Sequence, residues 1–268
     1  MAHLDIPKTY KLFIGGQFPR TESGRSFAVE DADGNLIANL CRASRKDFRN
    51  AVAAARKAQA GWADRAAFNR SQILYRLAEM LDGRRAQFLE ELDAQGALAE
   101  DAEQEVRASV DRLVYYAGWC DKYSQVAGTV NPVASSHFNF SVPEPMGVVG
   151  IVCSDTLGLL GLISLMAPVI AGGNTCVVLA SEKQPLCSIT FAEVVATSDV
   201  PGGVLNVLTG IREELLPQFA SHMDVNAIAY AGDHDMEVKT LQEGSALNLK
   251  RVHAYRKMDW LADSAQGP

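Results

Sequence analysis

The sequence predicts an α/β protein with a doubly wound, mainly parallel sheet. From residue 147 onward, short apolar segments alternate with helical segments, and the apolar segments carry hydrophobic residues at consecutive positions. Strands that are apolar on both faces are typical of a parallel sheet covered by helices on both sides. The chain has 268 residues, 48% hydrophobic and 21% charged, so it holds enough apolar material for a sizeable core.

The alternating part is expected to place its ligand-binding residues at one edge of the sheet. The predicted strands are 147–153, 175–179, 204–208, 226–230 and 249–253, and the helices between them are 156–171, 186–197, 213–221 and 234–245. Right-handed crossovers make this a nucleotide-binding type of sheet, in which ligands lie beyond the carboxyl ends of the strands. The segments of interest are therefore 153–157, 179–183, 209–212, 231–235 and 253–258.

The first half of the chain predicts small strands followed by helices. Turn residues separate the short apolar segments, and apolar residues at helical spacing follow them. The predicted strands are 10–14, 27–29 and 36–40, and the predicted helices are 47–60, 66–92 and 100–123.

Charge and cysteine content exclude several classes of protein. The net charge of −7, from 25 Lys and Arg against 32 Asp and Glu, argues against nucleic-acid and anionic-membrane binding. The uncharged stretch 156–173 is long enough for a membrane span, but its flanking Asp155 and glycines favour a core helix. Five scattered cysteines without a CxxC pair suggest neither disulfides nor zinc. With no signal-peptide pattern at the N-terminus, we expect a cytoplasmic protein.

Several motifs, in order and spacing, resemble the aldehyde dehydrogenase superfamily. They are Pro143-Glu-Pro-Met-Gly-Val-Val-Gly150, Gly173-Asn174-Thr175, Glu182 with Pro185-Leu186, Val200-Pro-Gly-Gly-Val-Leu-Asn-Val-Leu-Thr-Gly210, and His222-Met-Asp-Val225 before Gly232. Within the superfamily, segments 69–75, 197–203 and 259–267 are most similar to the degenerate second module of the two-module, family-sixteen enzymes.

The resemblance implies a domain organisation. It implies one Rossmann-like nucleotide-binding domain over 1–268, with N-terminal strands and helices at 8–130, an oligomerisation arm at 131–146 and βα repeats at 147–258. Members of the family are nearly twice as long, and their catalytic cysteine domain follows the segment that here ends at Pro268. We therefore expect this chain to lack the catalytic domain.

The resemblance also implies that catalytic groups have been lost. Aldehyde oxidation needs a thiolate, an oxyanion donor, a carboxylate that activates water and a bound nicotinamide. Thr156 stands where the family has its oxyanion-binding Asn, and Tyr255 stands where it has the activating Glu. Both positions are degenerate, so we predict no catalytic residue. Ser154 and Asp155 are predicted instead to cap the following helix.

The positions that hold the cofactor in the family are altered as well. Leu179 replaces the Lys that binds the ribose, and Asp233 places a carboxylate where the pyrophosphate would lie. Asp233 is predicted to cap the next helix. The remaining, vestigial cofactor-binding residues are Ser154, Thr156, Glu182, Gly210 and Gly232. We expect no cofactor, and at most weak binding of NAD or NADP.

Among the thiols, Cys153 is the best candidate for a replacement nucleophile. It lies at the carboxyl end of a strand against a helix N-terminus, which lowers a thiol pKa, although Asp155 opposes this. The alternative is that Cys153 is a small buried hydrophobe. The histidines, among them His137, His234 and His253, are too scattered for a metal site.

Three functional hypotheses follow. The first is a non-catalytic module that acts by oligomerisation or regulation, and whose arm around Phe138–Val142 binds a second copy or a full-length aldehyde dehydrogenase. The second is an NAD(P)-dependent aldehyde oxidoreductase activity as part of a split or multi-chain enzyme. The third is a decayed fragment without function.

Overall fold

The core of the molecule is a five-stranded parallel sheet with strand order β10-β9-β6-β7-β8. The computed structural model describes residues 8–31 and 33–266. The strands are β6 (Val148–Val152), β7 (Thr175–Leu179), β8 (Leu205–Leu208), β9 (Ala227–Ala231) and β10 (Arg251–Tyr255). All neighbouring pairs are parallel, which confirms the predicted doubly wound sheet. The order reverses between β6 and β9, so a crevice is expected at their carboxyl ends.

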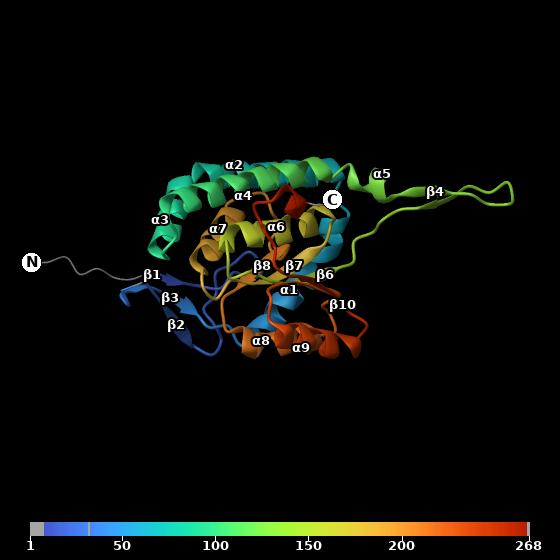
Figure 1. Cartoon of the computed structure of the whole chain (residues 1–268). Coiled ribbons are helices and arrows are strands. Elements are labelled where there is room, and N and C mark those ends of the chain that lie inside the picture. Colours follow the sequence, from blue (N-terminus) through green and yellow to red (C-terminus); the bar gives the residue numbers. More distant parts are fainter. Residues whose placement is uncertain (1–7, 32, 267–268) are drawn as a thin grey trace, which may run out of the picture.

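Helices cover both faces of this sheet (Figure 1). One face carries α1 (Arg45–Ala63), α8 (Arg212–Ser221) and α9 (Asp235–Ala246), and the other carries α6 (Gly158–Ala171) and α7 (Leu186–Ala196). An outer layer of α2 (Ala67–Gly83), α3 (Arg85–Ala94) and α4 (Ala99–Trp119) lies over α6 and α7. The apolar residues accordingly form two core clusters, one on each side of the sheet.

Helix α6 is apolar on all sides because it is buried between the sheet and the outer layer. Nearly every residue from Gly158 to Ala171 is buried, as expected for a core helix. Among the residues that the structure describes, no helix is long and apolar enough to cross a membrane.

The N-terminal segment forms a small three-stranded sheet in the order β1-β3-β2. Its strands are β1 (Lys8–Tyr10), β2 (Ser26–Glu30) and β3 (Leu36–Cys41). Phe13 joins this part to the main sheet through two backbone hydrogen bonds with Val207, of 2.9 and 2.8 Å.

Several element boundaries differ from the sequence prediction. The first predicted strand, 10–14, forms a ladder only up to Tyr10, because Phe13 pairs with Val207 of the main sheet instead. The predicted helix 66–92 is two helices, because Arg84 leaves the helical conformation directly after Gly83. The last strand begins at Arg251 rather than at 249.

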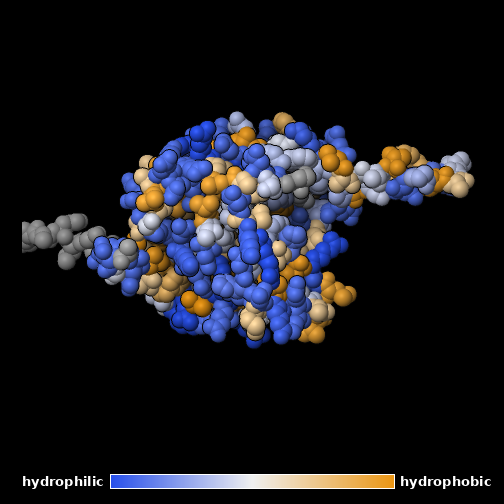
Figure 2. Space-filling model, viewed as in Figure 1, coloured by the Kyte–Doolittle hydropathy of each residue, from blue (hydrophilic) through white to orange (hydrophobic). Residues whose placement is uncertain are grey.

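A β-hairpin projects from the body of the protein (Figures 1 and 2). The short helix α5 (Tyr123–Ala127) leads into β4 (Thr129–Asn131), which pairs with β5 (Asn139–Ser141) in an antiparallel ladder. We call the segment 129–142 the arm.

The start of α6 is capped by distant side chains, and this corrects the predicted cap. Neither Ser154 nor Asp155 caps α6, whose N-cap residue Leu157 has a left-handed conformation with φ of 51°. Glu105 of α4 accepts hydrogen bonds from Leu159 N (2.8 Å) and Leu160 N (3.1 Å). Gln184 accepts a further bond from the first residue of the helix, at 2.9 Å. Long-range acceptors have thus replaced the local cap, because the chain around Leu157 turns away from a capping geometry.

Glu105 can be tested as the cap of α6. We expect Glu105→Ala to lower the free energy of unfolding by at least about 2 kcal/mol, because two buried N–H groups lose their acceptor. Glu105→Gln keeps an amide oxygen and should cost less than about 1 kcal/mol. Urea unfolding followed by circular dichroism measures both. Equal costs for the two variants would contradict a capping role.

Candidate functional site

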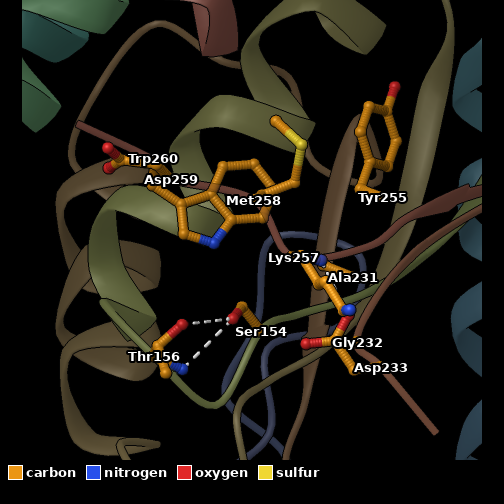
Figure 3. A pocket seen from close by; sticks show the side chains of 10 residues that line it. All are labelled: Ser154, Thr156, Ala231, Gly232, Asp233, Tyr255, Lys257, Met258, Asp259 and Trp260. Carbon is orange, nitrogen blue, oxygen red and sulfur yellow. Dashed lines mark hydrogen bonds between the residues drawn. The ribbon is translucent and has the colours of Figure 1, made fainter. Parts of the chain in front are cut away.

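A hollow lies where the order of the strands reverses, beyond the carboxyl ends of β6 and β9. Its volume is about 390 Å³. It is lined by Ser154, Thr156, Ala231, Gly232, Asp233, Tyr255, Lys257, Met258, Asp259 and Trp260 (Figure 3). Five residues that the sequence singled out therefore line the same hollow: Ser154, Thr156, Gly232, Asp233 and Tyr255. The topology brings them together, because each follows or ends a strand of the same sheet.

The hydroxyl groups of Ser154 and Thr156 are held in a closed turn. Ser154 Oγ accepts a hydrogen bond from Thr156 N at 3.1 Å and shares a second with Thr156 Oγ1 at 2.9 Å. This side-chain-to-backbone turn orients both hydroxyls at the edge of the hollow. At the edge of the hollow these side chains offer hydroxyl groups but no side-chain amide donor.

Asp233 stabilises a loop and does not cap α9, contrary to the prediction. Its carboxylate accepts a hydrogen bond from Lys257 N at 2.7 Å. Lys257 has a left-handed backbone, with φ of 48°, which an aspartate acceptor for its N–H helps to hold. The N-cap residue of α9 is His234, which makes no side-chain capping bond.

Tyr255 packs between two aromatic neighbours. Its ring centroid lies 4.4 Å from that of His253 and 6.4 Å from that of Trp260. Burial raises the pKa of Tyr255, so the phenol is neutral at physiological pH. Trp260 is fixed in turn by Arg112, which donates a hydrogen bond to the Trp260 carbonyl at 2.8 Å. Trp260 was not among the predicted site residues.

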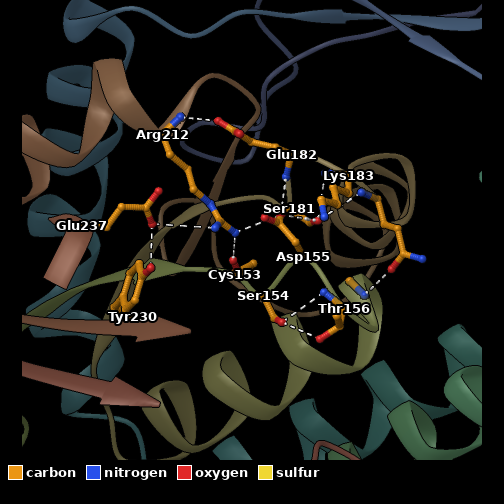
Figure 4. A network of polar contacts seen from close by, with 12 residues as sticks. Cys153, Ser154, Asp155, Thr156, Ser181, Glu182, Lys183, Arg212, Tyr230 and Glu237 are labelled. Atoms are coloured by element: carbon orange, nitrogen blue, oxygen red, sulfur yellow. Dashed lines mark hydrogen bonds and ion pairs between the residues drawn. The ribbon is translucent and has the colours of Figure 1, made fainter. Parts of the chain in front are cut away.

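Beside the hollow, the guanidinium of Arg212 lies among the carboxyl ends of the strands (Figure 4). Arg212 is 4% exposed. It donates hydrogen bonds to the Cys153 carbonyl and, at 3.0 Å, to Asp155 Oδ1. Its Nη1 lies 3.9 Å from Glu237 Oε2. One cation from the start of α8 thus reaches the end of β6 and the first turn of α9.

Further polar contacts complete what we call the Arg212 network. Asp155 Oδ1 also accepts from Ser181 Oγ and from Glu182 N, both at 3.1 Å. The Glu182 carboxylate accepts from the backbone N–H of Arg212. Tyr230 OH donates to Glu237 Oε2 at 2.6 Å, and burial raises the pKa of that phenol. The network therefore connects the carboxyl ends of β6, β7, β8 and β9.

The network assigns roles that differ from the predicted ones. Asp155 is a partner of Arg212 and not a helix cap, because a buried guanidinium needs a carboxylate more than a helix end that already has acceptors. Glu182 binds within the protein as well. Gly210 does not reach the hollow, since its Cα faces Ala43 and Leu215.

Arg212, Tyr230 and Glu237 were missed by the sequence analysis. Arg212 could have been recognised, because it is the one charged residue in the segment 209–212, which follows a buried strand.

Cys153 is a buried thiol. It is 0% exposed, and burial raises its pKa to about 12, despite the favourable charge of Arg212. A thiol with that pKa is not a nucleophile at neutral pH. Within the described parts of the chain, no group of three or more His, Cys, Asp or Glu side chains could hold a metal ion.

Comparison with known proteins identifies relatives across most of the chain. The model of the aldehyde dehydrogenase family matches residues 19–255. DhaS of Bacillus subtilis, described as an aldehyde dehydrogenase, is 32% identical over 249 residues, which cover 91% of this chain and 50% of DhaS. Cytosolic 10-formyltetrahydrofolate dehydrogenase of mouse is 30% identical over 255 residues, covering 93% of this chain and 28% of that protein.

Solved structures show the same fold. The NAD⁺ complex of an aldehyde dehydrogenase from Bacillus cereus superposes with a TM-score of 0.87 and 27% identity, covering 92% of this chain and 51% of that one. The NAD-dependent aldehyde dehydrogenase of Sinorhizobium meliloti gives 0.88 and 25%, covering 93% and 50%. The chain thus spans about half the length of these enzymes, or less.

The Arg212 network should be important for stability. We expect Arg212→Met to lower the free energy of unfolding by about 3–5 kcal/mol, because Asp155 and Glu237 lose a buried counter-charge. The matched control is Arg256→Met, whose partner Asp235 is 85% exposed in a 2.7 Å ion pair. That loss should stay within about 0.5 kcal/mol. Urea unfolding measures both, and similar losses would contradict a structural role for the network.

The buried state of Cys153 predicts a pH dependence. Its folded pKa of about 12 lies above the ordinary value of 9.0, so its contribution to stability is complete below pH 9 and is lost as the pH rises toward 12. A Cys153→Ala variant lacks this loss. The difference in unfolding free energy between wild type and variant should therefore narrow by about 1.4 kcal/mol between pH 7 and pH 10. Urea unfolding in reductant tests this, and a constant difference would argue for an accessible thiolate.

Proposed function

The chain belongs to the aldehyde dehydrogenase family, and we propose that it is a non-catalytic module that acts by oligomerisation or by regulating a partner. In this proposal the arm is the association element and the βα repeats at 147–258 are its rigid support. The observation that carries the proposal is the Arg212 network, in which the polar groups at the carboxyl ends of the strands are paired with one another.

The residues present do not fit a nicotinamide dinucleotide. The Arg212 guanidinium already has Asp155 and Glu237 as partners, so it is not available to a phosphate. Asp233 adds a carboxylate to the lining of the hollow, where it would repel an anion. Leu179 is fully buried in β7 and offers no polar group to a ribose. We therefore propose that the module works without NAD or NADP.

The side chains at the hollow do not supply aldehyde chemistry either. Thr156 provides only a hydroxyl, which is engaged with Ser154. Tyr255 is a neutral phenol packed on Trp260, so it cannot replace a carboxylate base. Cys153 is closed off from solvent and holds its proton.

The arm supports an association role because it leaves apolar side chains in solvent. Phe138 is 74% exposed and Phe140 is 57% exposed, and orange side chains are visible along the projecting arm in Figure 2. Exposed apolar groups on a free strand edge are typical of surfaces that a partner covers. We propose as partner either a second copy of this chain or a full-length aldehyde dehydrogenase.

Five free, buried cysteines support the further proposal that the protein works in a reducing compartment such as the cytoplasm.

A second candidate function is an NAD(P)-dependent aldehyde oxidoreductase assembled from more than one chain. The likeness to the Bacillus cereus enzyme in its NAD⁺ complex favours it, as does a hollow of about 390 Å³ at the strand ends. It requires a nucleotide to displace Arg212 from its carboxylate partners.

Titration with NAD and with NADP separates the two functions. We expect no binding up to millimolar concentration by calorimetry, because Arg212 is already paired with carboxylates and Asp233 in the lining of the hollow would repel a phosphate. Light scattering on the same sample should give a discrete oligomer. Micromolar binding of either nucleotide would contradict the non-catalytic proposal and favour the multi-chain enzyme.

A further inference from the structure

Arg112 of α4 is a second buried guanidinium, and among the described residues it has no carboxylate partner. The side chain is 1% exposed. Its Nη1 donates hydrogen bonds to Ser164 Oγ at 2.7 Å and to the Ala265 carbonyl at 2.9 Å, and its Nη2 donates to the Trp260 carbonyl at 2.8 Å. Its Nε is buried and has no hydrogen-bond partner in the part of the chain that the structure describes. All three acceptors that this cation reaches are neutral.

Comparison with Arg212 shows what the environment of Arg112 lacks. Arg212 is buried to a similar extent, at 4% exposed, and has carboxylate oxygens of Asp155 at 3.0 Å and of Glu237 at 3.9 Å. Burial lowers the pKa of Arg112, because the charged form is removed from water. A buried cation with only neutral acceptors is costly, and a carboxylate that reaches it relieves that cost. The interior of the protein thus holds one positive charge that an anion would stabilise.

Two N–H groups of Arg112 are not used by the protein. A guanidinium has five N–H donors, and three of them make the hydrogen bonds to Ser164, Trp260 and Ala265. The remaining two are on Nε and Nη2. Two N–H groups of one planar guanidinium match the two oxygens of a carboxylate, which is the geometry of the strongest arginine contacts. The unused donors therefore favour a carboxylate over other anions.

A hollow lies beside Arg112, between α4 and the C-terminal segment of the described chain. Its volume is about 300 Å³, and it is lined by Gln104, Arg107, Ala108, Asp111, Arg112, Leu261 and Gln266. We call it the α4 hollow. It shares no lining residue with the hollow at the strand ends. The 3₁₀ helix η1 (Asp263–Gln266) closes one side, where the Ala265 carbonyl is bound to Arg112 (Figure 1).

The lining of the α4 hollow suits an anion that also has an apolar part. Arg107 and Arg112 supply two positive charges against one carboxylate, that of Asp111. This excess of positive charge is local, because the chain as a whole carries a net charge of −7. The two glutamines of the lining add amide donors. Ala108 and Leu261 provide apolar contact for a short carbon chain.

We propose that the α4 hollow binds a small organic monocarboxylate. Its carboxylate lies against Arg112 and Arg107, and its carbon chain lies along Ala108 and Leu261. The proposal goes beyond the proposed association function and does not depend on it, because it involves neither the arm nor the Arg212 network. Arg112 also holds the Trp260 carbonyl, so the ligand binds to the residue that fixes Trp260 in the lining of the hollow at the strand ends.

Calorimetric titration with hexanoate tests the proposal. We expect hexanoate to bind to the full chain with a Kd of about 1 mM or lower. Hexanamide has the same carbon chain without the charge, so it should bind at least about tenfold more weakly. Inorganic phosphate has charge without the carbon chain, and it too should bind at least about tenfold more weakly. Equal binding of hexanoate and either comparison ligand, or no hexanoate binding at about 20 mM, would overturn the proposal.

Three variants locate the binding site. Ala108→Trp fills the hollow at a half-buried position and leaves the hydrogen bonds of Arg112 in place, so it should abolish hexanoate binding. Arg107→Gln removes an exposed charge and should weaken binding about two- to fivefold. The matched control is Arg76→Gln, at an exposed arginine of α2 that pairs with Glu79 at 3.1 Å, and it should leave the Kd unchanged. Hexanoate binding that neither Ala108→Trp nor Arg107→Gln weakens would place the carboxylate elsewhere and overturn the proposal.

The Nε–H resonance of Arg112 gives a measurement on the wild-type chain, which does not depend on the folding of any variant. In ¹⁵N-labelled protein, hexanoate should shift this resonance downfield, because a charge-assisted hydrogen bond forms at an N–H that had no acceptor. The Nε–H resonance of Arg76 serves as the internal reference and should not move. An Arg112 resonance that stays in place while hexanoate binds would contradict the assigned site.

Discussion

A buried positive charge at the switch point of the sheet constrains the rest of this structure. Arg212 lies at the carboxyl ends of the strands with its guanidinium almost fully out of solvent. A buried guanidinium is tolerated only where carboxylates and carbonyls surround it closely. Asp155 and the Cys153 carbonyl meet this need directly, and the Glu182 carboxylate fixes the backbone N–H of the same residue. The ends of the parallel strands are thus held together by the protein itself, at the place where such sheets bind ligands.

The sequence was a good guide to the strands and a poor guide to the caps, for a physical reason. Residues 148–152 and 175–179 are buried on both faces of the sheet. Burial on both faces requires consecutive apolar residues, and such a run is visible in the local sequence. A cap is different, because any acceptor of suitable geometry can supply it. At α6 that acceptor is Glu105, more than fifty residues away, and at Asp155 the expected partner was exchanged for Arg212. Local sequence preferences do not show which distant side chain packs nearby and supplies the hydrogen bond instead.

The same distinction explains what could be predicted of the site. Ser154, Thr156, Gly232 and Tyr255 meet at one hollow because topology alone sends the carboxyl ends of parallel strands to a common edge. Which side chains pair beside this hollow depends on where the long Arg212 side chain extends. The motif identified the degenerate positions. It did not identify Arg212 at the start of α8, whose role is evident only once Asp155 and Glu237 are known to face it.

The body and the arm of the protein therefore differ in how far their side chains are paired or covered. In the body, the polar groups at the strand ends are paired with one another, so a ligand would have to compete with existing ion pairs before gaining its own. In the arm, only the polar face is paired, and the exposed rings of Phe138 and Phe140 gain free energy from any apolar surface that covers them. Within the described part of this chain, the arm is thus a surface with exposed apolar groups, whereas the polar groups of the Arg212 network are already paired. The proposed function, in which ligand binding is lost and assembly is retained, is compatible with this fold, since the strand ends and the arm are separate in space.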